Sequence, residues 1–182
     1  MKSIKQMTAG ELGAFIQSRL KKKGINVVLS GGMSVEIYSS NQYTSRDFDF
    51  VQTSFGKRGI IKAEMEAMGF HEEGRSFAHP DTDLFVEFPP GPLTVGDEAV
   101  KDFREIRYST GVLKLISPTD CVKDRLTWYY HYGDQQCLDQ AVMVAQRHKI
   151  DLREVRRWSE HEGKLSEFEK VRSRLERKEA AR

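Results

Sequence analysis

The sequence predicts an α/β domain with a small mixed β-sheet flanked by helices, followed by a C-terminal helical annex. Up to residue 116, short runs of apolar and β-branched residues alternate with helix patterns, which is typical of an α/β sheet. From Ser117 onward, every pattern is helical. We therefore expect two units in this chain of 182 residues, an α/β domain over 1–116 and the annex over 117–182.

The first elements are a helix, a strand and a second, shorter helix. Thr8 and Glu11 form a capping-box pattern, and the apolar residues that follow recur at helical spacing until Gly24. The run 25–29 is apolar at nearly every position, as in a strand that is covered on both faces. A glycine pair ends this strand, and the spacing predicts a short helix over 33–38.

The middle of the chain alternates between strands and one further helix. Apolar spacing predicts a strand over 46–51 and a helix over 56–68. Two or three short strands fit between residues 70 and 88, and the last of them ends where the prolines of 89–92 begin. A β-hairpin is expected over 106–116.

The annex begins with a strong helix start. Ser117 is a capping residue, Pro118 suits the first helical turn, and Asp120 complements the helix dipole. This helix is expected to run to about residue 132. A second helix follows it, and a third opens at Asp151, so the annex is predicted to be entirely helical.

Composition excludes some classes of protein and leaves others open. The 29 basic and 27 acidic side chains nearly balance, so the overall charge does not single out a nucleic acid or a membrane as partner. No apolar run reaches the length of about 18 residues that a membrane helix needs, and the N-terminus lacks a secretory apolar core. We expect a cytoplasmic protein without a membrane partner, in which Cys121 and Cys137 are reduced thiols.

Ser30, Gly31 and Gly32 are a candidate phosphate-binding turn. A side chain at either glycine would keep the backbone amides away from phosphate oxygens, and the hydroxyl of Ser30 or Ser34 can add a donor. Taken alone, a glycine pair more often marks a tight turn between a strand and a helix. The functional interpretation therefore depends on the acidic residues that follow.

Asp47 and Asp49 are those acidic residues. They are two positions apart on the predicted strand over 46–51, so both side chains project to the same face. The competing interpretation is a strand end with solvated acids, which is less favoured because two unpaired carboxylates on one face repel each other. Together with the glycine pair, they predict a site for a metal-bound nucleoside triphosphate.

The order of these motifs resembles the nucleotidyltransferase superfamily of the DNA polymerase beta type. Within it, the nearest resemblance is to the small bacterial group of abortive-infection and toxin-type nucleotidyltransferases. It covers roughly residues 25 to 145. It rests on Ser30-Gly31-Gly32, on Asp47-Phe48-Asp49-Phe50, on Val86-Glu87-Phe88 and on the helix start Ser117-Pro118-Thr119-Asp120. The spacer before Asp47 is longer than in the family, and Arg125 stands where relatives usually carry a lysine.

The resemblance implies a magnesium-dependent transfer of a nucleoside monophosphate from a nucleoside triphosphate to a hydroxyl group. The acceptor would be RNA, a protein or a small molecule, and pyrophosphate would leave. Asp47, Asp49 and Glu87 would be the catalytic residues and would hold two Mg²⁺ ions. Asp83, four residues before Glu87 on the same strand face, is the rival for the third carboxylate.

Two features of the first annex helix are open to more than one interpretation. Lys123 and Arg125 are candidate cations for the triphosphate, and pairing with Asp120 or Asp124 is the alternative. The aromatic run 128–132 can offer a ring on which a base stacks, although a core role with one or two rings facing outward is favoured.

A function of a different class is also consistent with these residues. The fold can be kept as a non-catalytic nucleotide-sensing or protein-interaction module, as one half of a toxin-antitoxin pair. The third carboxylate discriminates between the two functions. If Glu87 and Asp83 both lie away from Asp47 and Asp49, catalysis is disfavoured while nucleotide binding survives.

Overall fold

The computed structural model of the chain describes residues 2–53 and 58–177. The strands are β1 (Val27–Ser30), β2 (Asp47–Gln52), β3 (His71–Glu73), β4 (Ser76–His79), β5 (Thr82–Glu87), β6 (Thr94–Val95), β7 (Glu98–Ala99), β8 (Phe103–Tyr108) and β9 (Gly111–Ile116). The α-helices are α1 (Ala9–Lys22), α2 (Gly31–Tyr38), α3 (Arg58–Ala67), α4 (Pro118–Tyr132), α5 (Gln135–Arg147), α6 (Leu152–His161) and α7 (Leu165–Glu176).

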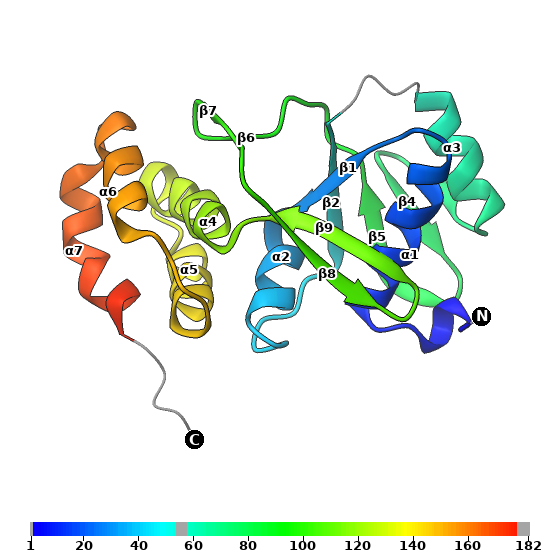
Figure 1. Cartoon of the computed structure of the whole chain (residues 1–182), viewed down its shortest axis with the longest axis horizontal. Coiled ribbons are helices and arrows are strands. Elements are labelled where there is room, and N and C mark those ends of the chain that lie inside the picture. The colour runs from blue at the N-terminus through cyan, green and yellow to red at the C-terminus, as the bar shows by residue number, and fades with distance from the viewer. Residues whose placement is uncertain (1, 54–57, 178–182) are drawn as a thin grey trace.

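A seven-stranded mixed sheet, in the order β3-β4-β5-β2-β1-β9-β8, forms the centre of the α/β domain (Figure 1). β2 pairs antiparallel with β1 and parallel with β5. Helix α1 packs on the face toward which Phe48 points, because a Cβ at Gly13 would lie 3.0 Å from the Phe48 ring. Side chains alternate along a strand, so Asp47 and Asp49 face away from α1. The predicted α/β fold with a helical annex is confirmed.

The predicted helix starts are confirmed by their caps. The Thr8 side chain accepts a hydrogen bond from the backbone N–H of Glu11. Ser117 accepts one from Asp120, and Pro118 occupies the first turn of α4. These bonds satisfy backbone N–H groups that have no partner inside the helix, which is why short polar residues specify the starts.

Two parts of the fold differ from the predictions. Helix α2 begins at Gly31 rather than at residue 33, so the glycine pair lies in the first helical turn. Strands β6 and β7 form a small hairpin after the proline segment, where no strand was predicted, because two-residue strands leave no detectable alternation. Residues 56 and 57 of the predicted helix over 56–68 lie outside the described residues.

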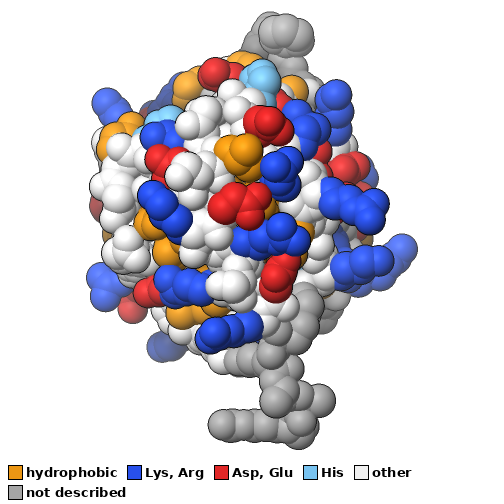
Figure 2. Space-filling model, turned by 90° about the vertical axis from the view of Figure 1, so that its left-hand side faces the viewer, with side chains coloured by type: hydrophobic (Ala, Val, Ile, Leu, Met, Phe, Trp, Pro, Cys, Tyr) orange, Lys and Arg blue, Asp and Glu red, His pale blue; other side chains and the backbone are white. Residues whose placement is uncertain are grey.

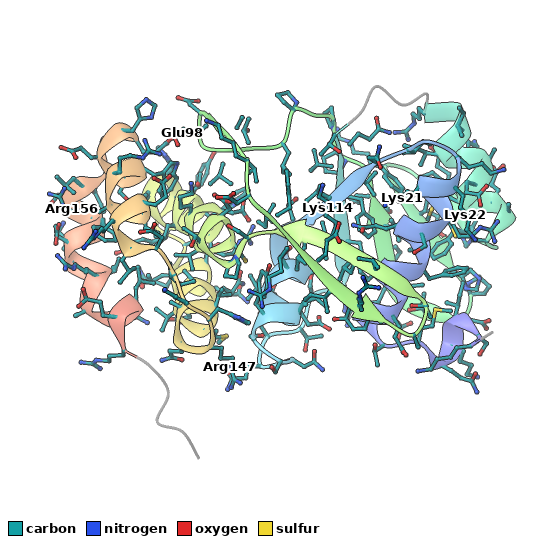
Figure 3. All side chains as sticks on the ribbon, viewed as in Figure 1. Lys21, Lys22, Glu98, Lys114, Arg147 and Arg156 are labelled. Atoms are coloured by element: carbon teal, nitrogen blue, oxygen red, sulfur yellow. The ribbon has the colours of Figure 1, made fainter. Side chains whose placement is uncertain are left out.

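The β6–β7 hairpin connects the α/β domain to the annex. The indole Nε1 of Trp158 in α6 donates a hydrogen bond to the backbone oxygen of Val95, at 3.2 Å. The guanidinium of Arg157 binds both carboxylate oxygens of Glu98, which Figure 3 shows on the hairpin beside the annex. The chain that leaves β5 after Glu87 is therefore fixed to α6 before it returns to the sheet as β8.

Lys and Arg side chains alternate with Asp and Glu side chains on the outer face of the annex (Figure 2). Arg156, for example, pairs with Glu160 and Glu169, and Arg172 with Glu169 and Glu176. This mixture agrees with the nearly neutral composition of the chain. Among the described residues, no helix is both long enough and apolar enough to cross a membrane.

Candidate active site

The register of three neighbouring strands aligns the predicted site residues. Asp49 of β2 is paired with Ser30 of β1 on one side and with Glu87 of β5 on the other. Paired residues on adjacent strands project to the same face, so the Asp49 and Glu87 side chains are neighbours. Asp47, two residues earlier, shares this face and pairs with Phe85.

Asp83 lies apart from this alignment. Since Asp47 at the start of β2 pairs with Phe85, the position opposite Asp83 falls before β2 begins. The Asp83 side chain is exposed, whereas Glu87 is half-buried beside Asp49. Of the two candidates for the third carboxylate, the register places Glu87 next to Asp49.

Gly31 makes room for the Asp49 carboxylate. Its φ angle is +67°, a conformation that favours glycine, and a Cβ at this position would overlap an oxygen of Asp49. Gly31 is itself buried, while Gly32 is half-buried beside Ser45 and Tyr43. The two glycines thus make room for different side chains: Gly31 admits the Asp49 carboxylate, and a Cβ at Gly32 would lie 3.0 Å from the hydroxyl oxygen of Ser45.

The serines of the predicted turn have different surroundings. Ser30 occupies the cap position of α2, but its side chain makes no capping hydrogen bond to the helix and instead donates to the backbone oxygen of Asp49, at 3.4 Å. Ser34 is fully buried, and its hydroxyl donates to the backbone oxygen of Leu29, at 3.3 Å. The N-terminal turn of α2 is therefore not closed by the Ser30 side chain.

Burial and neighbouring charges disfavour a negative charge on Asp49. Burial is the largest cause that raises its pKa, from an ordinary value of 3.8 to about 6, and the carboxylates of Glu87, Asp124 and Asp47 add to the effect. Arg125 acts in the opposite direction. Asp47 is exposed, and Asp49 and Glu87 are half-buried. A raised pKa on a carboxyl group beside other carboxylates is typical of functional sites.

Asp124 is a further acidic residue near Asp49 that the sequence patterns did not indicate. It lies on α4, and its charge acts on Asp49 across the junction between the domain and the annex. Nη2 of Arg125 binds Oδ2 of Asp124 at 2.6 Å, and Nη1 of Arg125 lies 3.4 Å from the Gln140 side chain. No sequence pattern connects Asp124 with Asp49, because the two residues are brought near each other by the packing of α4 against α2.

Lys123 and Arg125 form ion pairs with Asp120 and Asp124, as the alternative interpretation of the sequence predicted. Nζ of Lys123 lies 2.9 Å from Asp120 and 3.2 Å from Glu154, and Arg125 pairs with Asp124. These pairs are largely buried rather than on the surface. The charge of Lys123 is therefore already compensated by two carboxylates.

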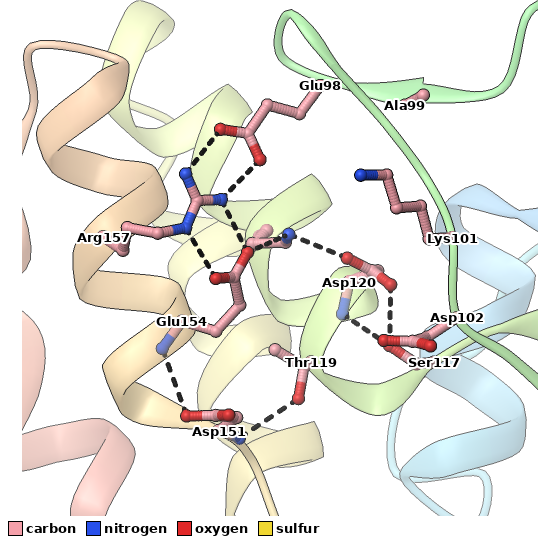
Figure 4. Close-up of a pocket in the computed structure, with 11 residues that line it drawn as sticks. Glu98, Ala99, Lys101, Asp102, Ser117, Thr119, Asp120, Asp151, Glu154 and Arg157 are labelled. Atoms are coloured by element: carbon pink, nitrogen blue, oxygen red, sulfur yellow. Dashed lines mark hydrogen bonds and ion pairs between the residues drawn. The ribbon is translucent and has the colours of Figure 1, made fainter.

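Lys123 lines a separate polar cleft of about 770 Å³ (Figure 4). The cleft lies between the β6–β7 hairpin, the start of α4 and helix α6. Arg157 crosses it, binding Glu98 on the hairpin and Glu154 on its own helix. None of Asp47, Asp49 and Glu87 lines this cleft. We interpret its ion pairs as the contacts that hold the hairpin against the annex.

Acidification is expected to weaken these contacts through Glu154. Hydrogen bonds from Arg157 and then from Lys123 lower the pKa of Glu154 from 4.5 to about 2. A carboxyl whose pKa is lower in the folded state adds stability above about pH 4.5, and this stability is lost as the pH falls toward about 2. The melting temperature, measured by thermal unfolding across this pH range, should fall less for Glu154→Gln than for the wild type.

Glu160→Gln is the control, because Glu160 is exposed on the same helix. Its melting temperature should change with pH as that of the wild type does. An equal dependence on pH for all three proteins would contradict the role of Glu154.

The donor types of the site suit a divalent metal ion, but the side chains are not yet gathered around one point. Within residues 2–53 and 58–177, no three His, Cys, Asp or Glu side chains form a group that could already hold a metal ion. Asp47, Asp49 and Glu87 nevertheless supply the carboxylate oxygens that Mg²⁺ prefers, and a cation would offset the unfavourable charge on Asp49. The chemistry of the donors therefore fits Mg²⁺.

Three solved structures resemble the chain over most of its length. An antigenic nucleotidyltransferase-like protein from Paracoccidioides brasiliensis has a TM-score of 0.64 at 11% identity, over 93% of both chains. The antibiotic-resistance factor ANT(2'')-Ia, in its solution structure, has a TM-score of 0.52 at 14% identity, over 92% of this chain and 94% of that one. The lincosamide antibiotic adenylyltransferase LnuA, with lincomycin bound, has a TM-score of 0.51 at 16% identity, over 76% of this chain and 98% of that one.

At these identities, similarity to a solved structure establishes the fold and nothing finer. No family model matches the sequence, and no curated protein matches it. The fold expected from the motif order is the fold that is found. The chain has a nucleotidyltransferase-like fold.

Proposed function

We propose that the protein is a magnesium-dependent nucleotidyltransferase that moves a nucleoside monophosphate from a nucleoside triphosphate to a hydroxyl acceptor. The observation that carries this proposal is the alignment of Asp49 with Glu87 and Ser30, beside a glycine whose missing side chain admits the Asp49 carboxylate. Residues 1–116 would form the catalytic domain, and residues 117–182 the annex that closes the nucleotide cleft.

In this proposal, Asp47, Asp49 and Glu87 would hold Mg²⁺, which supplies positive charge to the triphosphate and to the leaving pyrophosphate when it is bound. The N–H groups at the start of α2, next to Gly32, orient the phosphates. Glu87 also accepts the proton of the acceptor hydroxyl, whose oxygen forms a bond to the α-phosphorus. The bond from the α-phosphorus to the bridging oxygen breaks, and pyrophosphate leaves with that oxygen.

The acceptor in this proposal is a small molecule, RNA or a protein. Two of the similar structures are antibiotic-modifying or antibiotic-resistance proteins by name, and one holds lincomycin, which supports a small hydroxylated molecule as the first acceptor to test. The motif resemblance to abortive-infection and toxin-type enzymes supports RNA or a protein instead. Labelling of a mixture of cellular molecules distinguishes these acceptors.

A non-catalytic nucleotide-sensing module, as part of a toxin-antitoxin pair, is the second candidate function. One observation favours it: the charge of Lys123 is already compensated by Asp120 and Glu154. Thermal unfolding with each nucleoside triphosphate, with and without Mg²⁺, tests both functions. Labelled-nucleotide transfer onto a cell extract is measured alongside. Stabilisation that requires Mg²⁺ together with a labelled product supports the enzyme, stabilisation without a labelled product supports the sensor, and no stabilisation by any nucleotide contradicts both.

Paired substitutions on β5 test the assignment of the third carboxylate. Glu87→Gln should lower nucleotidyl transfer by about a hundredfold or more, because it removes one ligand and the proton acceptor. Asp83→Asn should retain transfer, since Asp83 is exposed and lies opposite no residue of β2. Initial rates with both variants check this prediction. The reverse ranking of the two variants would show that Asp83 is the third carboxylate.

A further inference from the structure

Two large aromatic side chains of α4 are exposed to solvent and contact each other. Trp128 is 47% exposed and Tyr132 is 74% exposed. Their ring centroids lie 5.2 Å apart, with an angle of 33° between the ring planes. Tyr130, in contrast, is buried and stacks on Trp158 in the core of the annex. The aromatic run 128–132 thus has core members and two rings that face outward.

The exposed rings share a face of α4 with a residue of the candidate active site. Trp128 follows Asp124 by four positions, and Tyr132 follows Trp128 by four, so the three side chains form one row along the helix. Each step of four residues advances about 6 Å along the helix axis. The first residue of this row, Asp124, carries a negative charge that raises the pKa of Asp49. Helix α4 also packs against α2, whose first turn contains Gly31 (Figure 1). The ring pair therefore lies on the same face of α4 as Asp124, one and two steps further along the helix.

We propose that Trp128 and Tyr132 form the stacking surface for the base of the nucleoside triphosphate, a role that rests on the proposed function. Tyr132 packs against Trp128 and can hold its indole in place, and the exposed part of an indole suits stacking against a planar base. The nearest charged group along the row, Asp124, is already paired with Arg125. An uncharged aromatic base is accordingly the partner that fits the rings. The triphosphate would be bound by the start of α2 and by the Mg²⁺ ions that the carboxylates hold.

Intrinsic fluorescence can report this contact directly. The chain has two tryptophans, and Trp158 is fully buried, so changes at the surface come from Trp128. ATP, GTP, CTP and UTP with Mg²⁺ would each be compared with inorganic tripolyphosphate and Mg²⁺, which carries the phosphates without a base. We expect quenching and protection from acrylamide with at least one nucleotide, and neither effect with tripolyphosphate.

Substitution then separates stacking from phosphate binding. Trp128→Ala should weaken binding of that nucleotide by roughly tenfold or more, from the usual worth of a base-aromatic stack, and leave tripolyphosphate binding unchanged. Trp128→Phe keeps a ring and should recover most of the affinity. Ile60→Ala, which removes an exposed apolar side chain from α3, is the matched control and should bind both ligands as the wild type does.

The outcomes distinguish this inference from the proposed function. If nucleotides bind but Trp128→Ala binds them as tightly as the wild type, the stacking surface is contradicted and the proposed function stands. If neither nucleotides nor tripolyphosphate bind, the proposed function fails and the inference fails with it. If protection of Trp128 instead rises with protein concentration alone, together with a doubling of the mass in solution, a second copy covers the rings and the inference is overturned.

Discussion

Asp49→Asn is expected to abolish nucleotidyl transfer and to make the protein more stable. In the proposed function Asp49 is a metal ligand, and the loss of such a group should lower the rate by a factor on the order of a thousand. In the folded state its charge is disfavoured by burial and by Glu87, which raises the pKa to about 6. Removing that charge should raise the free energy of unfolding by about 1 to 3 kcal/mol at pH 7.

The expected gain in stability of Asp49→Asn should depend on pH, and this dependence provides a control. The Asp49 carboxyl binds its proton more tightly in the folded state than in the unfolded state, so the wild type should gain stability from this group as the pH falls from about 7 to about 4. Asparagine does not titrate, and the advantage of the variant should shrink over the same range. Denaturant unfolding at several pH values measures both proteins. A variant that is less stable than the wild type at pH 7 would show that Asp49 is a structural residue.

Gly31→Ala is expected to destabilise the fold and to remove activity together. The φ angle of +67° is strained for alanine, and the new Cβ would overlap the Asp49 carboxylate, which must then move. Strain and overlap together should lower the free energy of unfolding by about 2 to 5 kcal/mol. Denaturant unfolding and transfer assays on the same preparation check both effects.

Two further variants separate strain from overlap. Gly24 has a φ of +76°, and a Cβ at this position would have no other atom within 4 Å, so Gly24→Ala should show the strain alone, about 1 to 2 kcal/mol. In the Asp49→Ala background, the cost of Gly31→Ala should fall to that of Gly24→Ala, because the overlapping carboxylate is gone. An unchanged cost in that background would contradict the contact between Gly31 and Asp49.

Local signals in the sequence were sufficient for most of the fold. The capping residues Thr8, Ser117 and Asp151 each define a helix start by a side-chain hydrogen bond that involves only neighbouring residues. Asp47 and Asp49 could be placed on one strand face because alternation is a property of any β-strand. Such features need no knowledge of the tertiary structure.

Features that depend on packing between distant segments could not be predicted from local patterns, and Glu87 was named as the third carboxylate only through the family resemblance. The register that aligns Glu87 with Asp49 results from the pairing of β5 with β2, between which helix α3 and strands β3 and β4 intervene in the chain. Asp124 reaches the site only because α4 packs against α2. Gly31 was interpreted as space for a phosphate, whereas it gives space to a carboxylate, which is visible only once β1 and β2 are paired.

Transfer of a nucleoside monophosphate can be measured by incubating the protein and Mg²⁺ with a nucleoside triphosphate labelled at the α-phosphate, in the presence of a cell extract. We expect covalent label on an acceptor, release of an equal amount of pyrophosphate, and neither product with Asp49→Asn. Binding of the nucleotide without a labelled acceptor would contradict this function, as would labelling of the acceptor only in a parallel reaction with the γ-labelled nucleotide.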